Sequence, residues 1–111
     1  MNVSEPIKYN FSEEYTKYPG GRFERLGPFS GEDFRENVLR DYFNSGTKIK
    51  IDATGIVTSF SPSFLDEAFG QLAREYGLQK FVETVELFSS DNPGLKEKMM
   101  YYVERAISAQ P

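Results

Sequence analysis

The chain has 111 residues, of which 39% are apolar, and its 17 acidic and 13 basic residues give a net charge of −4. This length fits one domain and leaves no room for a second, so we expect a single domain over residues 1–111 with flexible ends at 1–5 and 109–111. The absence of cysteine and histidine excludes disulfides, thiolate and imidazole metal ligands and a Ser-His-Asp triad, and we expect neither a cofactor nor a bound metal.

The first elements in the chain have the pattern of strands. Ile7, Tyr9 and Phe11 alternate with polar residues, which predicts a half-buried strand. The Pro and Gly residues at 18–22 favour a turn, and Arg22–Leu26 is predicted as a second strand that Gly27-Pro28 ends.

A helix is predicted to begin at Ser30, whose hydroxyl can cap the first turn, with Asp33 at the capping-box position. The segment 44–46 ends it, because Gly is the usual residue after a last helical turn. Its apolar face has helical spacing and consists of Phe34, Val38, Leu39, Tyr42 and Phe43.

The next strand is predicted over Thr47–Asp52, with Ile49 and Ile51 directed inward. The pattern also allows it to continue after Gly55 through Val57. Strand, helix and strand at this spacing indicate a crossover unit with helices packed on a sheet.

A second helix follows the polar loop 58–63. Ser61 can be its N-cap, since Pro62 then occupies the first helical position, where a missing N–H has no cost. Ser63 with Asp66 is an alternative capping box. Gly77 ends the helix, whose apolar stripe consists of Phe64, Leu65, Ala68, Phe69, Leu72 and Ala73.

The remainder predicts a strand near Val82–Leu87 and a last helix that Asp91 or Asn92 caps, with Pro93 near its first position. The predicted order is β-β-α-β-α-β-α. The buried face of the last helix consists of Leu95, Met99, Tyr102, Val103, Ala106 and Ile107.

Two segments resemble the STAS domain, the fold of anti-sigma factor antagonists. Lys50–Val57 is similar to its strand and Asp-containing turn, and Ser61–Leu65 to its serine loop and helix start. The chain is more closely similar to a STAS-like family of unknown function, from about Ile7 to Ile107. The resemblance implies a STAS-like α/β domain with helices packed on a mixed β-sheet. It rests on Pro19–Arg22, Ser30–Arg35, Ile51–Gly55 and Ser61–Gly70.

The resemblance also implies a phosphoacceptor. The antagonists carry Asp-Ser-Ser-Gly at the helix start, and a partner kinase phosphorylates the second Ser. This sequence has no Asp there, and Pro62 interrupts the serine pair. Alignment without a gap places Pro62 at the acceptor position, whereas a shift of one residue places Ser63 there. Ser63 and Ser61 are the candidates, and the implied partner is a kinase-like ATPase of the anti-sigma type.

The preferred function is therefore a non-enzymatic interaction or regulatory module. Its expected partner surface consists of Ser59, Phe60, Ser61, Ser63, Phe64, Asp66 and Glu67. Simpler interpretations stay open: the serines can be caps alone, and the Phe residues can belong to the core. Adjacent helix positions point about 100° apart, so Asp66 and Glu67 are not expected to converge on one substrate.

A small enzyme or ligand binder is the first alternative. Asp52 follows a buried strand at the edge where α/β ligand sites gather, although such residues also accept backbone hydrogen bonds in turns. Arg22, Ser30, Gly31 and Arg35 can form an anion cradle, since Gly31 permits close approach of a ligand, or can be a cap beside an Arg–Glu surface pair.

The second alternative is a phage or defence-type inhibitor that masks a basic surface of a host protein. Nucleic acid is not expected as a partner, because the basic groupings at 22–25 and 96–98 are each interrupted by Glu. No apolar run approaches the roughly 20 residues that span a bilayer, and Met1–Pro6 is polar, unlike a signal peptide. We expect a cytoplasmic protein.

Overall fold

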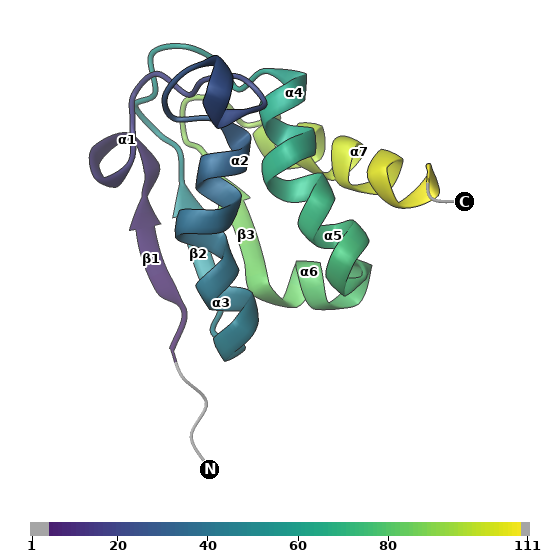
Figure 1. The fold of residues 1–111 in the computed structure, drawn as a ribbon. Helices are drawn as coiled ribbons and strands as arrows, with labels where there is room; N and C mark the ends of the chain where they lie inside the picture. The colour runs from purple at the N-terminus through teal and green to yellow at the C-terminus, as the bar shows by residue number, and fades with distance from the viewer. Residues whose placement is uncertain (1–4, 110–111) are drawn as a thin grey trace.

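The computed structural model describes residues 5–109. Its centre is a sheet of three strands, β1 (Ile7–Asn10), β2 (Ile49–Asp52) and β3 (Val85–Phe88), in spatial order β1-β2-β3. Both neighbouring pairs are parallel, so the expectation of a mixed sheet is wrong for the residues described. Because parallel strands need crossover connections, each link between strands runs through a helical segment in front of the sheet (Figure 1).

The first crossover contains one continuous helical segment, which we call the first rod. It consists of α2 (Gly31–Phe34), the π-helical turn η2 (Arg35–Leu39) and α3 (Arg40–Ser45). Ser30 Oγ accepts a hydrogen bond from the Asp33 backbone N–H at 3.0 Å, which confirms the predicted N-cap. Gly46, at φ 73°, ends the rod as predicted.

The second rod has the same layout: α4 (Pro62–Leu65), the π-helical turn η3 (Asp66–Gly70) and α5 (Gln71–Tyr76). Ser61 Oγ accepts from the Phe64 N–H at 3.0 Å, so Ser61 is the N-cap and Ser63 is not. After Gly77, the short helix α6 (Leu78–Thr84) leads into β3.

The core lies between the rods and one face of the sheet. The inward strand residues Ile49, Ile51 and Leu87 are almost fully buried, and a cluster of buried Phe rings from both rods and from 11, 60 and 81 packs over them. The helix α7 (Leu95–Ser108) lies against the second rod and β3, beyond the second rod in Figure 1. No helix among residues 5–109 combines the length and the apolar character needed to cross a membrane.

The predicted second strand, Arg22–Leu26, is wrong. Glu24–Leu26 forms the 3₁₀ turn η1 within a loop. The Gly31 N–H donates to Gly21 O, and the Glu32 N–H donates to Arg22 O. The loop backbone is therefore paired with the start of the first rod instead of with the sheet.

Four predicted boundaries also need correction. Phe11 begins the short helix α1 (Phe11–Glu14) instead of ending β1. β2 stops at Asp52 and does not reach Val57, whose N–H donates instead to Lys17 O in the segment after α1. The order β-β-α-β-α-β-α therefore loses its second strand and gains short helices.

The last two boundary corrections lie near the C-terminal end. Residues up to Thr84 are helical, so β3 begins only at Val85. α7 begins at Leu95 after Gly94 and has no side-chain cap. Asp91 instead accepts from the Gly55 N–H at 3.0 Å. The ends predicted as flexible lie outside the described residues except for Glu5 and Ala109, and that prediction stays a prediction.

Candidate functional site

The serine loop and the start of the second rod place their serines in different situations. Ser59 is exposed, whereas Ser61 and Ser63 are each partly buried. Ser61 is occupied as the N-cap. Ser63, at the second helical position, makes no hydrogen bond within the described residues through its hydroxyl. The structure therefore separates the two candidates: Ser61 has a structural task and Ser63 has an accessible, unengaged hydroxyl.

Three members of the predicted partner surface are buried, and their assignment to that surface is wrong. Phe60 and Phe64 are 2% and 0% exposed, with their ring centroids 5.2 Å apart, and both pack against Phe11. Glu67 is 7% exposed. The two rings therefore belong to the core beneath the loop.

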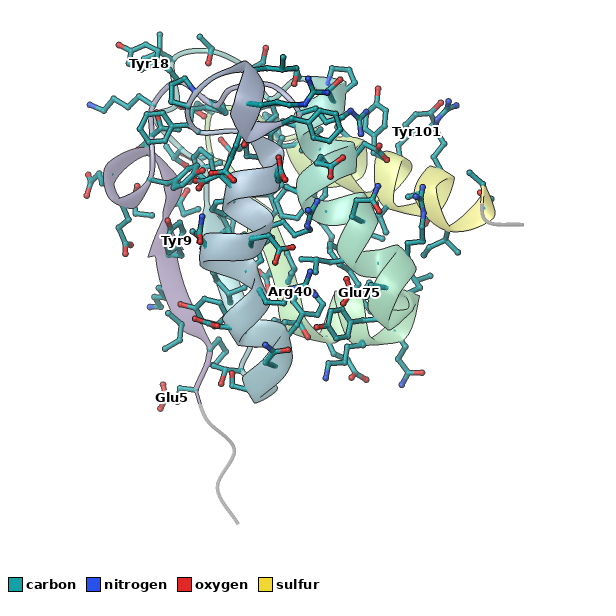
Figure 2. All side chains as sticks on the ribbon, in the orientation of Figure 1. Glu5, Tyr9, Tyr18, Arg40, Glu75 and Tyr101 are labelled. Atoms are coloured by element: carbon teal, nitrogen blue, oxygen red, sulfur yellow. The ribbon has the colours of Figure 1, made fainter. Side chains whose placement is uncertain are left out.

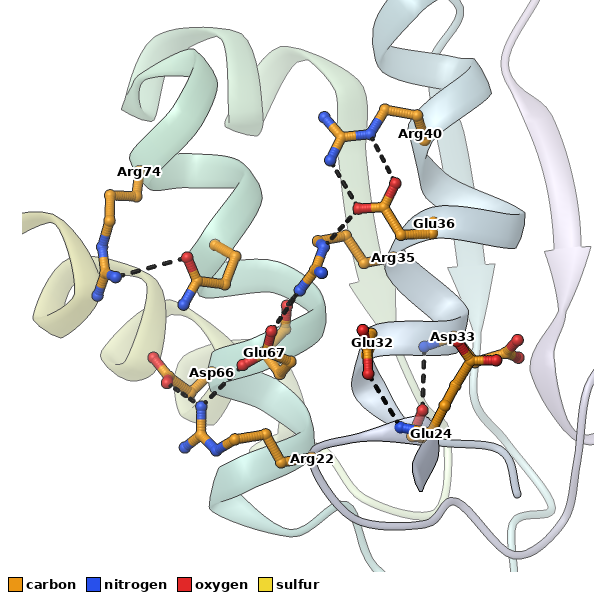
Figure 3. Close-up of polar contacts among 12 residues, drawn as sticks. Arg22, Glu24, Glu32, Asp33, Arg35, Glu36, Arg40, Asp66, Glu67 and Arg74 are labelled. Atoms are coloured by element: carbon orange, nitrogen blue, oxygen red, sulfur yellow. Dashed lines mark hydrogen bonds and ion pairs between the residues drawn. The ribbon is translucent and has the colours of Figure 1, made fainter. Parts of the chain in front are cut away.

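The carboxylates of Asp66 and Glu67 both contact one group, and that group is an arginine of the protein and not a substrate. Arg22 Nη1 lies 2.7 Å from Asp66 Oδ2 and 3.0 Å from Glu67 Oε1 (Figure 3). The long arginine side chain reaches from the loop before the first rod and contacts both carboxylates through this one nitrogen. These carboxylates therefore hold that loop in place.

Glu67 also binds the first rod. Arg35 Nη1 donates to Glu67 Oε2 at 2.6 Å and to the Glu67 carbonyl oxygen at 2.9 Å. The chain of ion pairs continues through Glu36 to Arg40, which reaches Glu75 of the second rod at 2.6 Å. Arg40 and Glu75 extend toward each other from the two rods in Figure 2.

The arginines lower the pKa of the Glu36 carboxyl to about 2, first through the hydrogen bond from Arg40 and then through that from Arg35. The carboxylates in turn raise the pKa of Arg22 and of Arg40. These shifts favour the charged forms of Glu36, Arg22 and Arg40, and we call the network of ion pairs the clamp between the rods.

The anion cradle expected from Arg22, Ser30, Gly31 and Arg35 does not form. Ser30 is 1% exposed and acts as a cap. A Cβ on Gly31 would lie 2.7 Å from Phe64 O, so the glycine permits close approach of the second rod instead of a ligand. Arg22 and Arg35 do come together, but they meet on Glu67.

A hollow of about 360 Å³ opens beside Ser63, and we call it the arginine hollow. It lies between the second rod and the C-terminal half of α7. The residues that line it are Arg22, Pro62, Ser63, Asp66, Arg74, Tyr102, Arg105, Ala106 and Ala109. The sequence pointed to Ser63, Asp66 and Arg22 but missed Arg74, Tyr102 and Arg105, because no local signal shows that α7 packs against the second rod.

A second hollow, of about 390 Å³, lies at Asp52, and we call it the strand-end hollow. Asp52 Oδ1 accepts from the Thr54 N–H at 2.9 Å, so its carboxylate shapes the turn after β2 as one of the two interpretations expects. The lining residues are Lys8, Tyr9, Asn10, Glu14, Lys50, Asp52 and Phe88. Neither Arg22 nor Ser30 reaches this hollow, so the two parts of the predicted ligand site are separate.

Within residues 5–109, no group of three or more acidic side chains is arranged to hold a metal ion. Every buried side-chain nitrogen or oxygen in that range has a hydrogen-bond partner. The polar groups of the interior are therefore satisfied by the fold itself.

Comparison with protein families gives a match. A family model described as a STAS-like domain of unknown function matches residues 30–95, more than half of the chain. This span runs from the N-cap of the first rod to the first residue of α7 and includes both rods, β2 and β3. Neither the curated proteins nor the solved structures contain a significant match to the chain.

Proposed function

This chain belongs to the STAS-like domain family of unknown function, and on that premise we propose that it is a protein-interaction and regulatory module that docks a partner protein. The docking surface is the outer side of the serine loop and of the second-rod start. Without the buried Phe60, Phe64 and Glu67, the predicted surface retains Ser59, Ser61, Ser63 and Asp66. We add to it the neighbouring Thr58 and Pro62, and all six residues are exposed or partly exposed.

One observation carries this proposal: Ser63 is accessible and unengaged beside a polar hollow, while the residues around it are fixed by the core and by the ion pairs. A rigid surface that presents an unengaged hydroxyl beside a hollow suits a switchable contact. A phosphate on Ser63 would add up to about two negative charges to that surface at neutral pH. A partner that reads the surface would respond to that change.

The proposed partner is a kinase-like ATPase of the anti-sigma type, in line with the antagonists that the serine loop resembles. Purified chain incubated with such a kinase and ATP should gain the mass of one phosphate. Ser63→Ala should abolish the gain, and Ser61→Ala should retain it. If neither serine gains phosphate and Ser63→Glu leaves partner affinity unchanged, the switch is wrong.

Docking itself needs a separate test. Ser59→Arg places a bulky cation on the exposed loop and should prevent capture of the partner. Gln79→Arg is the matched control, because Gln79 is an exposed residue of α6, outside the proposed surface. Equal partner affinity of both variants and the wild type would place the docking surface elsewhere. Identification of the captured protein also distinguishes a regulatory partner from the basic host protein that a phage or defence-type inhibitor would mask.

The strand-end hollow supports a second candidate function, the binding of a small polar ligand. It lies at the carboxyl ends of parallel strands, where ligands of α/β proteins bind. Lys8 and Lys50 lie side by side in the sheet register at its rim. Screening of small carboxylates against the wild type and Lys50→Ala by thermal shift tests this candidate, and identical melting profiles for the two proteins with every compound would dismiss it.

A further inference from the structure

We propose that the arginine hollow is a binding site for a phosphate-type anion, that is, a tetrahedral group with two negative charges. This goes beyond partner docking, since it concerns the chemistry of the hollow and applies to a free anion as well as to one carried by Ser63. The proposal rests on the side chains that line the hollow.

The charge of the hollow opposes the charge of the protein. Three guanidinium groups and one carboxylate line it, a local excess of positive charge in a chain of net charge −4. Guanidinium groups bind phosphate through planar pairs of N–H donors. Such a concentration of arginines at one concave place favours anions over cations there.

Arg22 retains donors for a ligand. It contacts both Asp66 and Glu67 through a single nitrogen, Nη1. Its Nη2 and Nε have no hydrogen-bond acceptor among the described residues. The two carboxylates thus fix the position of the guanidinium without using its whole donor set.

The opposite wall of the hollow comes from α7 and α5. Arg74 donates from Nε to the Ala106 carbonyl at 3.1 Å, which holds it against α7. The Arg105 guanidinium lies 6.0 Å from the centre of the Tyr101 ring and has no carboxylate partner among residues 5–109. Hydroxyls of Ser63 and Tyr102 add neutral donors to the lining.

Asp66 is the opposing group, because it is the one carboxylate of the described lining and already neutralises part of the charge of Arg22. An anion must therefore compete with it, and we expect binding to weaken with rising salt. Arg22 is the residue that both would share.

The test is a titration of the full chain with inorganic phosphate at constant ionic strength, followed by two-dimensional NMR of backbone and arginine side-chain N–H groups. The N–H resonances of Ser63 and Arg105 are expected to shift and to reach a plateau as the phosphate concentration rises. Arg105→Ala should weaken the apparent affinity roughly tenfold, as expected for loss of a charge-assisted contact. Arg25→Ala is the matched control, since Arg25 is another exposed arginine beside an aromatic ring, that of Phe23, outside the hollow.

Ser63→Glu separates the two sources of the anion. Its tethered carboxylate should occupy the hollow and reduce the binding of free phosphate, which would identify Ser63 as a position from which a covalent phosphate reaches the same arginines. Three outcomes would each overturn the proposal. The first is a set of NMR shifts in the wild type that do not saturate with phosphate, and the second is equal weakening of phosphate binding by Arg105→Ala and Arg25→Ala. The third is a Ser63→Glu variant that binds phosphate as well as the wild type does. Partner docking is measured separately, so it can persist when phosphate binding fails.

Discussion

Gly31 and Phe64 mark the place where the two rods touch. The backbone carbonyl of Phe64 would lie 2.7 Å from a Cβ at position 31, closer than any side chain tolerates. This contact sets the separation of the rods, and it brings Glu67 within reach of Arg35 from the first rod and of Arg22 from the preceding loop. The position of the second-rod start therefore depends on the absence of a side chain at Gly31 of the first rod.

Gly31→Ala should destabilise the fold by about 1–3 kcal/mol, because the added methyl group forces the rods apart in a close-packed region. Gly21→Ala is the control, since a Cβ there meets no atom within 4 Å, and it should change the free energy of unfolding by less than about 0.5 kcal/mol. Urea unfolding followed by circular dichroism measures both. Equal midpoints for the two variants would contradict the close contact.

Glu67→Gln should destabilise the chain by about 1–3 kcal/mol, because the guanidinium groups of Arg22 and Arg35 then lose a negatively charged partner at a nearly buried site. Glu75→Gln removes a carboxylate that is 51% exposed and pairs with Arg40, so its effect should stay below about 0.5 kcal/mol. Chemical denaturation of both variants gives the comparison. A larger loss from Glu75→Gln would mean that the network depends on its exposed end.

Substitutions of Ser61 and Ser63 should differ in their effect on the stability of the protein as well as on its phosphorylation. Ser61→Ala removes the N-cap hydrogen bond to Phe64 N–H and should cost about 1 kcal/mol. Ser63→Ala breaks no hydrogen bond within the described residues and should leave the melting temperature nearly unchanged. Calorimetry of the two variants decides the matter, and a greater loss from Ser63→Ala would show that Ser63 is the cap in solution.

Acid should weaken the clamp between the rods. The pKa of Glu36 falls from 4.5 to about 2 in the folded chain, through its hydrogen bonds with Arg40 and Arg35. A carboxyl group with a lowered folded pKa stabilises the protein above its unfolded value, and the contribution is lost as the pH falls from 4.5 toward 2. Unfolding free energies across that range should therefore fall less steeply in Glu36→Gln than in the wild type.

The control for that pH series is Glu97→Gln. Glu97 is an exposed residue of α7 without an ion pair among residues 5–109, and its substitution should leave the slope unaltered. A wild-type slope in Glu36→Gln would contradict the assigned role. Because Glu36 is 42% exposed, screening by salt should also reduce the difference between the wild type and Glu36→Gln.

The sequence by itself determined the local features of the protein. Ser30 and Ser61 were predicted as N-caps, Gly46 and Gly77 as helix ends, and Ile49 and Ile51 as the inward residues of a strand, and the structure confirms each. These predictions succeed because a cap, a stop and an alternating pattern depend on residues within one or two turns. The resemblance in the serine loop likewise pointed to the family.

Only the tertiary structure decided what the charged residues do. Arg22 and Glu67 are 45 residues apart and meet only because the loop before the first rod folds over the second rod. Arg105 reaches the surroundings of Ser63 through the packing of α7. The local pattern predicted that Glu67 belongs to the partner surface and that Arg22–Leu26 is a strand. Both predictions are wrong, since periodicity describes a segment's own faces and not which distant segment covers them. The energy of a charge depends on the groups brought beside it, and this is why the fold could be inferred in part from sequence but the site could not.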